Sequence, residues 1–451
     1  MGVEITRRAT LLGLASGLAS VADARARQAA RPAKPPGPVV INNVNIFDGI
    51  EGQPKPGNVL IADRKIGRIS SGAIAAPPDA TVIDGRGRVL MPGLTDAHWH
   101  MVMAPNTMED IEQADPGLMY ANAVAEARRT LMRGFTTIRD VAGPTFGLKA
   151  AIDAGVIAGP RVYPSGAIIS QTSGHGDLAP PHARPPTVGG QPSRFQEVGL
   201  GAVVNGVPEI LAAVRQQLRK GASQIKVAVG GGVFTDYDPL DSVQFTPEEM
   251  RAAVQAASDW GTYVAAHVYG PAGIRRAIEA GVMSIEHGQT ADEAAVRLIG
   301  EKGAWLSLQP FQPGDNPMTP EQEQKAEPTM HWDRVAEWAK RHGVKVAFGT
   351  DVLFQPEGTH MQNEMLTRFA DAFGTVEALR IGTSRNCELF AMSGRRDPYK
   401  EAKLGVIQEN AWADVLVIDG DPTKDINVLK DFERNLVVII KDGTIHKNTL
   451  A

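Results

Sequence analysis

At 451 residues, the chain is long enough for two or three domains, or for one barrel with an appended domain. Apolar residues make up 43% of it, charged residues 22%, and the net charge is −5. Because there is no basic stripe to neutralise phosphates, no nucleic-acid partner is expected. The single cysteine, Cys387, excludes an internal disulfide and a thiolate zinc finger, so any metal must be held by His, Asp, Glu or a modified Lys.

The N-terminus has the features of an export signal. The pair Arg7-Arg8 precedes an apolar stretch over residues 9–22, and two overlapping A-x-A cleavage candidates follow. This stretch is too short for a spanning helix and is typical of a twin-arginine signal; an amphipathic helix is the alternative. We predict an export signal over residues 1–30, a Pro-rich linker over 31–38, and a periplasmic or secreted protein with no membrane partner after export.

Both ends of the remaining chain have the pattern of short strands. Residues 39–91 contain runs rich in β-branched residues that Gly, Asp and Pro separate, and the same texture returns over 401–451 in ADVLVIDGD and NLVVIIKDGTIHKN. We therefore predict one small β-sandwich domain assembled from both termini, with its first part at 39–91 and its second at 401–451.

The middle of the chain, residues 92–400, alternates between helical patterns and short apolar runs. Amphipathic stretches end at Gly134 and Gly221, and Thr246-Pro247 gives a helix an N-cap followed by proline at the first helical position. The apolar runs are VLMPGLTDAHWH, FTTIRDV, RVYPSG, SQIKVAVGGG, TYVAAHV, MSIEHG, AWLSLQP and KVAFGTD. Eight strands alternating with helices predict an α/β fold, a (β/α)8 TIM barrel, which would be the catalytic domain.

Polar side chains lie toward the carboxyl ends of five of these strands, where barrel enzymes place their chemistry. They are His98 and His100 on the first strand, Lys226 within the fourth, His267 on the fifth, His287 on the sixth and Asp351 at the end of the eighth. Strand side chains alternate, so His98 and His100 face the same side and can share one ion, while Trp99 points outward to a helix. Taken singly, His267 and His287 also suit hydrogen-bonded core histidines, and Asp351 suits a helix N-cap.

Lys226 is the most informative of these residues. An ammonium group flanked by Ile225 and Val227 inside a barrel has a large desolvation cost, so its pKa should fall or the group should be modified. A lysine that reacts with CO2 becomes an anionic carbamate, which can bridge two cations. The neighbouring glycines at 230–232 would let the loop backbone approach the metals closely.

As a set, these motifs resemble those of the amidohydrolase superfamily of metal-dependent hydrolases. The resemblance is carried by DAHWH at 96–100, QIKVAVGGG, AAHVYG, SIEHG and FGTD, and it extends to the β domain and to AWADVLVIDGDP near the C-terminus. Within the superfamily, SGHGD at 173–177 and FTDYDPLDSVQFTPEEMRAAV are similar to the branch of secreted prolidase-like carboxypeptidases and ochratoxin-degrading amidohydrolases.

The resemblance implies two Zn²⁺ or similar divalent ions per chain. His98, His100 and Asp351 would bind one ion, His267 and His287 the other, and Lys226 carboxylated by CO2 would bridge them. Asp351 would also be the catalytic acid–base group, taking a proton from the attacking hydroxide and giving it to the leaving amine. Relatives in this branch are commonly multimeric, so a homo-oligomer is expected.

Substrate contacts are less well defined by the sequence. The segment from 170 to 205, rich in Gly, Pro and His and without helical period, is predicted to be a functional loop over the barrel mouth. His175 and Tyr237 are candidates for substrate binding, with loop packing as the alternative for each. His360, just beyond the eighth strand, is either a pocket residue or a helix cap.

The leading hypothesis is a secreted or periplasmic binuclear zinc hydrolase of amide bonds in small molecules. Its substrates would be dipeptides or N-acyl amino acids, including ochratoxin A, which would be cleaved to ochratoxin alpha and phenylalanine. A mononuclear deaminase or cyclic-amide hydrolase on the same scaffold is the second hypothesis, and Lys226 argues against it. A non-catalytic metal- or ligand-binding protein is the third, and the complete ligand set with Asp351 argues against that.

Overall fold

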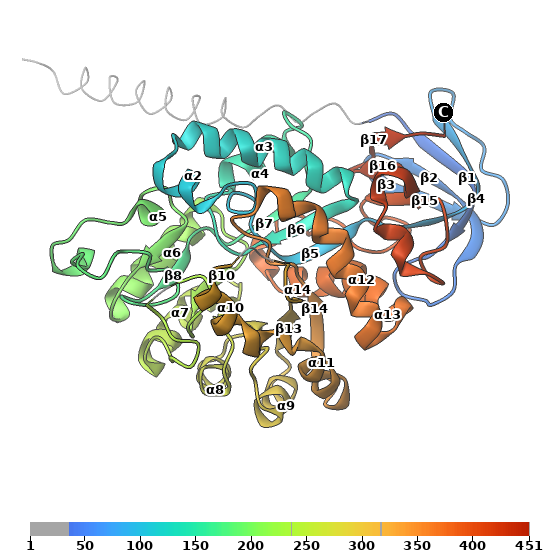
Figure 1. Cartoon of the computed structure of the whole chain (residues 1–451). Coiled ribbons are helices and arrows are strands. Elements are labelled where there is room, and N and C mark those ends of the chain that lie inside the picture. Colours follow the sequence, from blue (N-terminus) through green and yellow to red (C-terminus); the bar gives the residue numbers. More distant parts are fainter. Residues whose placement is uncertain (1–35, 236, 316–317, 451) are drawn as a thin grey trace, which may run out of the picture.

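The structure is a computed structural model that describes residues 36–235, 237–315 and 318–450 (Figure 1). The predicted export signal, residues 1–30, and the first part of the predicted linker lie outside the described residues. Within the described ranges, no helix is long and apolar enough to cross a bilayer.

The two ends of the described chain build one β domain (Figure 1). Its sheet has the strand order β17-β16-β15-β4-β1-β2-β3. β1 and β4 pair in parallel, and the other neighbours are antiparallel. The strands are β1 (Val39–Ile46), β2 (Lys55–Ala62), β3 (Lys65–Ser70), β4 (Thr81–Pro92), β15 (Val415–Ile418), β16 (Leu436–Lys441) and β17 (Thr444–Asn448).

This sheet folds over its own apolar face. Ile66 of β3 exchanges backbone hydrogen bonds with Ala411 (2.9 Å) and Asn410 (2.8 Å), just before β15. Side chains from both halves of the sheet, such as Ile41 and Val417, are buried together between them. The predicted sandwich is therefore formed by one continuous sheet, to which both ends of the sequence contribute.

The middle of the chain is a (β/α)8 barrel, as predicted. Its strands pair in parallel, and the third is bent into two pieces, β7 and β8. Two backbone hydrogen bonds join the two barrel sheets, from Ser223 to Pro164 and from Asp351 to His98, both 2.8 Å. The strands are β5 (Leu94–Trp99), β6 (Phe135–Asp140), β7 (Arg161–Pro164), β8 (Ile168–Ser170), β10 (Ile225–Ala228), β11 (Val264–Val268), β12 (Ser284–His287), β13 (Trp305–Leu308) and β14 (Lys345–Phe348).

Most of the helices cover the outside of this barrel (Figure 1). α7 begins as predicted: Thr246 is the N-cap, its hydroxyl accepts from the backbone N–H of Glu249, and Pro247 is the first helical residue. The helices are α2 (Met108–Gln113), α3 (Pro116–Met132), α4 (Phe146–Asp153), α6 (Val207–Lys220), α7 (Pro247–Asp259), α8 (Pro271–Ala280), α9 (Glu293–Glu301), α10 (Pro320–Ala326), α11 (Trp332–Arg341), α12 (Gln362–Phe373), α13 (Thr375–Arg380), α14 (Asn386–Ala391) and α15 (Phe432–Asn435).

The segment from 170 to 205 contains more regular structure than its sequence predicts. It holds the one-turn helix α5 (Arg194–Glu197) and the strand β9 (Gly201–Val203), which pairs with β8. A helix of one turn is too short to produce a periodic pattern, which is why the sequence predicts only a loop. Trp99 is buried with its ring 5.8 Å from the guanidinium of Arg133 at the end of α3, so it faces a helix as predicted.

Candidate metal centre

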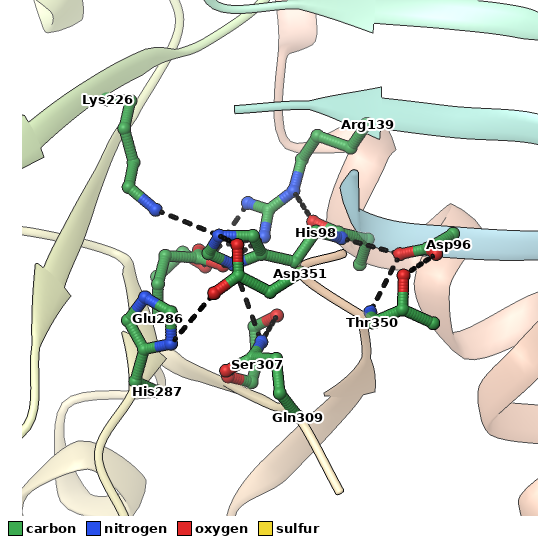
Figure 2. A network of polar contacts seen from close by, with 12 residues as sticks. Asp96, His98, Arg139, Lys226, Glu286, His287, Ser307, Gln309, Thr350 and Asp351 are labelled. Atoms are coloured by element: carbon green, nitrogen blue, oxygen red, sulfur yellow. Dashed lines mark hydrogen bonds and ion pairs between the residues drawn. The ribbon is translucent and has the colours of Figure 1, made fainter. Parts of the chain in front are cut away.

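The structure brings all six predicted metal ligands together at the carboxyl end of the barrel, where they line one cavity. Figure 2 shows four of them, His98, Lys226, His287 and Asp351. All six side chains are buried. His98 Nε2 lies 3.3 Å from Asp351 Oδ1 and 3.4 Å from Lys226 Nζ. His100 Nε2 lies 2.9 Å from the same oxygen of Asp351. On the other side of the group, the rings of His267 and His287 have centroids 4.4 Å apart.

Asp351 reaches this cluster because the end of β14 lies directly against β5. Asp96 of β5 accepts hydrogen bonds from the backbone N–H of Thr350 (3.2 Å) and from its hydroxyl (2.6 Å). Gly349 permits the approach, since a Cβ at this position would lie 2.3 Å from the Cβ of His98. These contacts place Asp351 over the two histidines of β5.

Two of the cluster residues have left-handed backbone conformations. Asp351 has φ 55° and His287 has φ 78°. Such values are uncommon outside glycine and often mark functional sites. At His287 the turn has a clear consequence: Glu286 and His287 are consecutive, yet Glu286 contacts His98 (2.8 Å) and His287 faces Asp351 (3.8 Å), both inside the barrel.

His98 on β5 and His100, the residue after its end, each have one ring nitrogen beside an oxygen that can only accept. His98 Nδ1 lies 2.8 Å from a carboxylate oxygen of Glu286, and His100 Nδ1 lies 3.4 Å from the carbonyl oxygen of Ala142. His100 Nε2, however, lies closer to an acceptor, 2.9 Å from Asp351 Oδ1, so the contacts of His100 do not place its proton on Nδ1. In His98 the contact of Nδ1 with Glu286 is the shortest, so the proton sits on Nδ1 and Nε2 has the lone pair. This is the arrangement of histidines that bind metal ions in proteins.

The other two histidines complete the set. His267 Nε2 is held by the carbonyl oxygen of Gly231 (3.1 Å). His287 Nδ1 is buried and has no hydrogen-bond partner among the described residues. A buried polar atom without a partner is costly, and a metal ion beside Asp351 would satisfy it. The donor set therefore fits a metal centre.

Electrostatics keep these groups in the forms that bind a cation. Burial lowers the pKa of His100, and it lowers the pKa of His267 and His287 to values well below the ordinary one, so the rings are neutral. Burial also lowers the pKa of Lys226 to about 8, as predicted. Burial alone would raise the pKa of Asp351, but the neighbouring imidazoles, that of His98 first, outweigh it and hold this pKa well below its usual range.

One compact group of possible ligands contains residues from both predicted ion sites. Ligand atoms of His98, His287 and Asp351 lie within 4.8 Å of one another. His98 comes from one predicted set and His287 from the other, and Asp351 lies between them. A divalent cation therefore has a suitable place here, while the assignment of each residue to one of two ions stays a prediction.

An apolar cavity opens over the cluster. Its walls include Met103, Phe195, Phe234, Phe311 and Phe354, and Phe234 and Phe354 meet edge to face with centroids 6.4 Å apart. Among the described lining residues, positively charged or titratable nitrogen groups are limited to Lys226 and the histidines. The cavity is therefore suited to neutral, apolar groups beside the metal centre.

Of the predicted substrate residues, His175 lines this cavity. Its ring stacks on that of His267 at 3.8 Å and 7°, and its Nδ1 lies 3.3 Å from Asp238 Oδ2. Gly232 makes room for it, because a Cβ there would lie 1.9 Å from the imidazole. The glycines that were predicted to approach the metals thus contact histidines: Gly231 through its carbonyl and Gly232 through its missing side chain.

The structure does not bring the other two predicted substrate residues into the cavity. Tyr237 is 44% exposed, and its backbone carbonyl accepts from the hydroxyl of Ser173. His360 is exposed and its Nδ1 lies 2.6 Å from the carbonyl oxygen of Glu357 in its own turn. Neither residue lies on the described cavity wall.

Three residues that the sequence reasoning did not select belong to this region. Glu286 and Arg139 lie beneath the histidines, each completely buried. Tyr269 lines the cavity, and its ring stacks on that of His287 with centroids 4.8 Å apart. The signal for Glu286 and Arg139 was present: each is a charged residue inside an apolar strand, as Lys226 is.

The chain belongs to the amidohydrolase family, whose family model matches residues 89–446. It is therefore a hydrolase of amide bonds from a metal-binding family. It is 33% identical to the ochratoxinase of Aspergillus niger over 376 residues, which cover 80% of this chain and 76% of the relative.

Two solved structures extend this result. A prolidase complexed with N-methylphosphonate-L-proline is 32% identical, with a TM-score of 0.83, covering 91% of this chain and all of that one. A Xaa-Pro dipeptidase with methionine bound in its active site is 30% identical, with a TM-score of 0.76 and coverage of 91% and 100%. These relatives confirm the predicted branch.

Proposed function

We propose that this protein is a binuclear zinc hydrolase that cleaves the amide bond between an acyl group and an amino acid. Its substrates would be N-acyl amino acids or dipeptides, with ochratoxin A among them. The observation that carries the proposal is the convergence of four imidazoles, Lys226 and Asp351 on one point beneath an apolar cavity. The likeness to an ochratoxinase and to a prolidase supports the same substrate class.

The proposed ligand sets are those that the resemblance to the amidohydrolase family implies. His98, His100 and Asp351 would hold one ion, His267 and His287 the other, and Lys226, carboxylated by CO2, would contact both. The lone pair on Nε2 of His98 and the unpartnered Nδ1 of His287 support a cation at each of these two rings. When bound, two divalent ions polarise the scissile carbonyl and acidify the attacking water.

Asp351 is the residue placed to move protons. Its Oδ1 faces His98 and His100, its Oδ2 faces His287, and its low pKa keeps the carboxylate ionised and able to accept. It would take a proton from the attacking water and transfer it to the nitrogen of the leaving amino acid. His175, fixed by stacking on His267, would hold the substrate carbonyl or carboxylate at the cavity wall.

The apolar wall indicates which amides enter. The ring pair of Phe234 and Phe354 and the side chains of Met103 and Phe311 offer contacts to an aromatic or branched apolar group. Sulfur–aromatic contacts of methionine are adaptable, so the wall can accept acyl groups of different shape. A basic substrate side chain would find no described carboxylate there besides Asp351.

Export and assembly are further parts of the proposal. The twin-arginine pattern and A-x-A candidates in residues 1–30 support a periplasmic or secreted protein. The branch to which the chain belongs supports a homo-oligomer. Fractionation of the native host and light scattering of the purified protein test these two statements.

A hydrolysis screen combined with metal analysis tests the proposed reaction. The purified protein, supplied with Zn²⁺, is incubated with N-acyl amino acids, with Xaa-Pro, Xaa-Arg and Xaa-Phe dipeptides, and with ochratoxin A. The expected result is release of the free amino acid, fastest from apolar substrates, and close to two ions per chain. Release of ammonia from aminated heterocycles with no amide cleavage would favour the deaminase alternative, and no turnover of any substrate would contradict the proposal.

A further inference from the structure

A buried ion pair lies beneath the metal centre, on the side of His98 that faces away from Asp351 (Figure 2). One terminal nitrogen of Arg139, on β6, lies 2.7 Å from both carboxylate oxygens of Glu286, on β12. Neither residue is exposed. Oε2 of Glu286 is also the oxygen that contacts His98 Nδ1 at 2.8 Å, so the pair touches a predicted ligand directly.

The position of this pair is fixed by the barrel itself. Arg139 Nε donates to the carbonyl of Ala97 on β5 (2.6 Å), and its other terminal nitrogen donates to the hydroxyls of Tyr263 (3.2 Å) and Ser284 (3.3 Å). Strands β5, β6 and β12 and the residue just before β11 therefore all hold it.

We propose that Glu286 and Arg139 are positioning residues that set the proton of His98 on Nδ1 and so prepare the metal site. A carboxylate can only accept, so the ring nitrogen that faces the nearer carboxylate, that of Glu286 at 2.8 Å, must donate. The lone pair of His98 is then on Nε2, the nitrogen 3.3 Å from Asp351 and 3.4 Å from Lys226. Arg139 compensates the buried charge of Glu286 and keeps its oxygens in place. This inference rests on the proposed metal centre.

Two contacts favour the opposite tautomer, and both are longer than the contact of Nδ1 with Glu286. Asp351 Oδ1 lies 3.3 Å from Nε2 of His98. The side-chain amide of Gln309 lies 3.4 Å from His98 Nδ1 and could donate to it. The same amide donates to the carbonyl oxygen of Ser307 at 3.1 Å. Glu286 lies 2.8 Å from Nδ1, whereas Gln309 lies 3.4 Å from it, and Glu286 carries a full negative charge. Glu286 therefore decides which ring nitrogen of His98 carries the proton.

The chain offers a matched control for this pair. Glu126 and Arg133, also buried, form an ion pair of 2.5 Å at α3, and it contacts none of the cluster histidines in the described structure. Glu286→Gln and Glu126→Gln each break a buried carboxylate–guanidinium pair, and Glu126→Gln also breaks the pair of Glu126 with Arg129 (2.9 Å). Only Glu286→Gln also offers His98 a side chain that can accept or donate, which removes the preference for one tautomer.

Two measurements on the full-length protein test the proposal. Zn²⁺ affinity is measured by competition with a chromophoric chelator, and the protonated ring nitrogen of His98 is identified by ¹⁵N NMR of the metal-free protein. We expect Glu286→Gln to weaken Zn²⁺ binding by roughly 10- to 100-fold and to lose the single Nδ1–H form of His98. Glu126→Gln should keep wild-type Zn²⁺ affinity and the Nδ1–H signal.

If Glu286→Gln does not fold because Arg139 is left unpaired, the double variant Glu286→Gln/Arg139→Gln removes both charges and is measured in its place. Wild-type Zn²⁺ affinity together with an unchanged His98 tautomer in either variant would overturn this inference and leave the proposed function intact. A wild-type protein that binds no Zn²⁺ would overturn both.

Discussion

Lys226 and Lys441 are both buried, and burial lowers the pKa of each to about 8, yet they lie in different surroundings. Lys226, on β10, lies beside His98 within a ring of groups whose lone pairs or negative charge face it. Lys441 ends β16 in a cavity between the β domain and the end of α4, near Asp153 and His446.

The charges near Lys441 are already paired with other groups. Arg161 forms ion pairs with Asp414 (2.8 Å) and Asp442 (2.7 Å), and the positive charge of Arg161 further lowers the pKa of Lys441. The side-chain amine of Lys441 has neither a hydrogen bond nor an ion pair to any described residue. A lowered lysine pKa therefore does not define a site: convergent ligands distinguish Lys226, whereas Lys441 has only the cost of burial.

The largest expected effect is that of Lys226→Ala. Removing the group that would become the bridging carbamate should lower kcat/KM by more than about 100-fold, beyond the range typical of residues that only orient a ligand, and should reduce the metal content. Added acetate should restore part of the activity, because a small carboxylate fits the space of the lost carbamate. Metal analysis and kinetics with and without acetate check this.

Lys441→Ala is the control for that experiment, since it removes the other buried lysine. It should retain wild-type kcat/KM and metal content and show no response to acetate. A Lys226→Ala protein that kept both metals and full activity would contradict the proposed mechanism and would make the two lysines equivalent.

The difference between the two lysines also shows where sequence reasoning stops. In a (β/α)8 barrel, side chains near the carboxyl ends of the strands all lie at the same end of the barrel. For this reason Lys226, His267 and Asp351 could be identified together from the sequence. Lys441 precedes Asp442-Gly443, whose positive φ values of 55° and 72° form a hairpin turn, so its sequence predicts an ordinary exposed residue. Its burial comes from the docking of the β domain on the barrel.

The same limit applies beneath the metal centre. Arg139 and Glu286 are 147 residues apart, and the sequence around either residue does not indicate which residue it pairs with. Strand alternation also predicts that Glu286 and His287 face opposite sides, and only the left-handed backbone at His287 turns both into the barrel. For Tyr237 and His360 the sequence left open whether the side chain contacts substrate or packs in its own loop or turn, and neither residue lies on the described cavity wall.

The second prediction concerns stability. The pKa of Lys441 is about 8 in the folded chain and 10.5 without the fold, so below pH 8 the cost of its buried charge is fully present. Between pH 8 and 10.5 the unfolded chain binds more protons, and stability rises with pH. Lys441→Met should therefore stabilise the protein at pH 7 by about 3 kcal/mol, and the gain should shrink toward zero near pH 10.5.

Chemical denaturation of wild type and Lys441→Met at pH 7 and pH 10 measures this difference. If Lys441→Met were less stable than wild type at pH 7, the amine of Lys441 would be making a favourable contact. The statement that only Lys226 has partner groups around its amine would then be wrong.

The smallest expected effect separates His175 from Tyr237, which the sequence could not distinguish as substrate residues. His175 stacks on His267 and lines the cavity, so His175→Ala should lower kcat/KM by about tenfold, the loss of roughly one hydrogen bond to a charged or polarised group, with metal content nearly unchanged. Tyr237→Phe removes a hydroxyl from a side chain that is 44% exposed and should leave kcat/KM unchanged. Steady-state kinetics on the best amide from the screen compare the two. A loss in Tyr237→Phe equal to that in His175→Ala would mean that the loop after β10 closes over the substrate, and that the cavity wall extends further than its described residues.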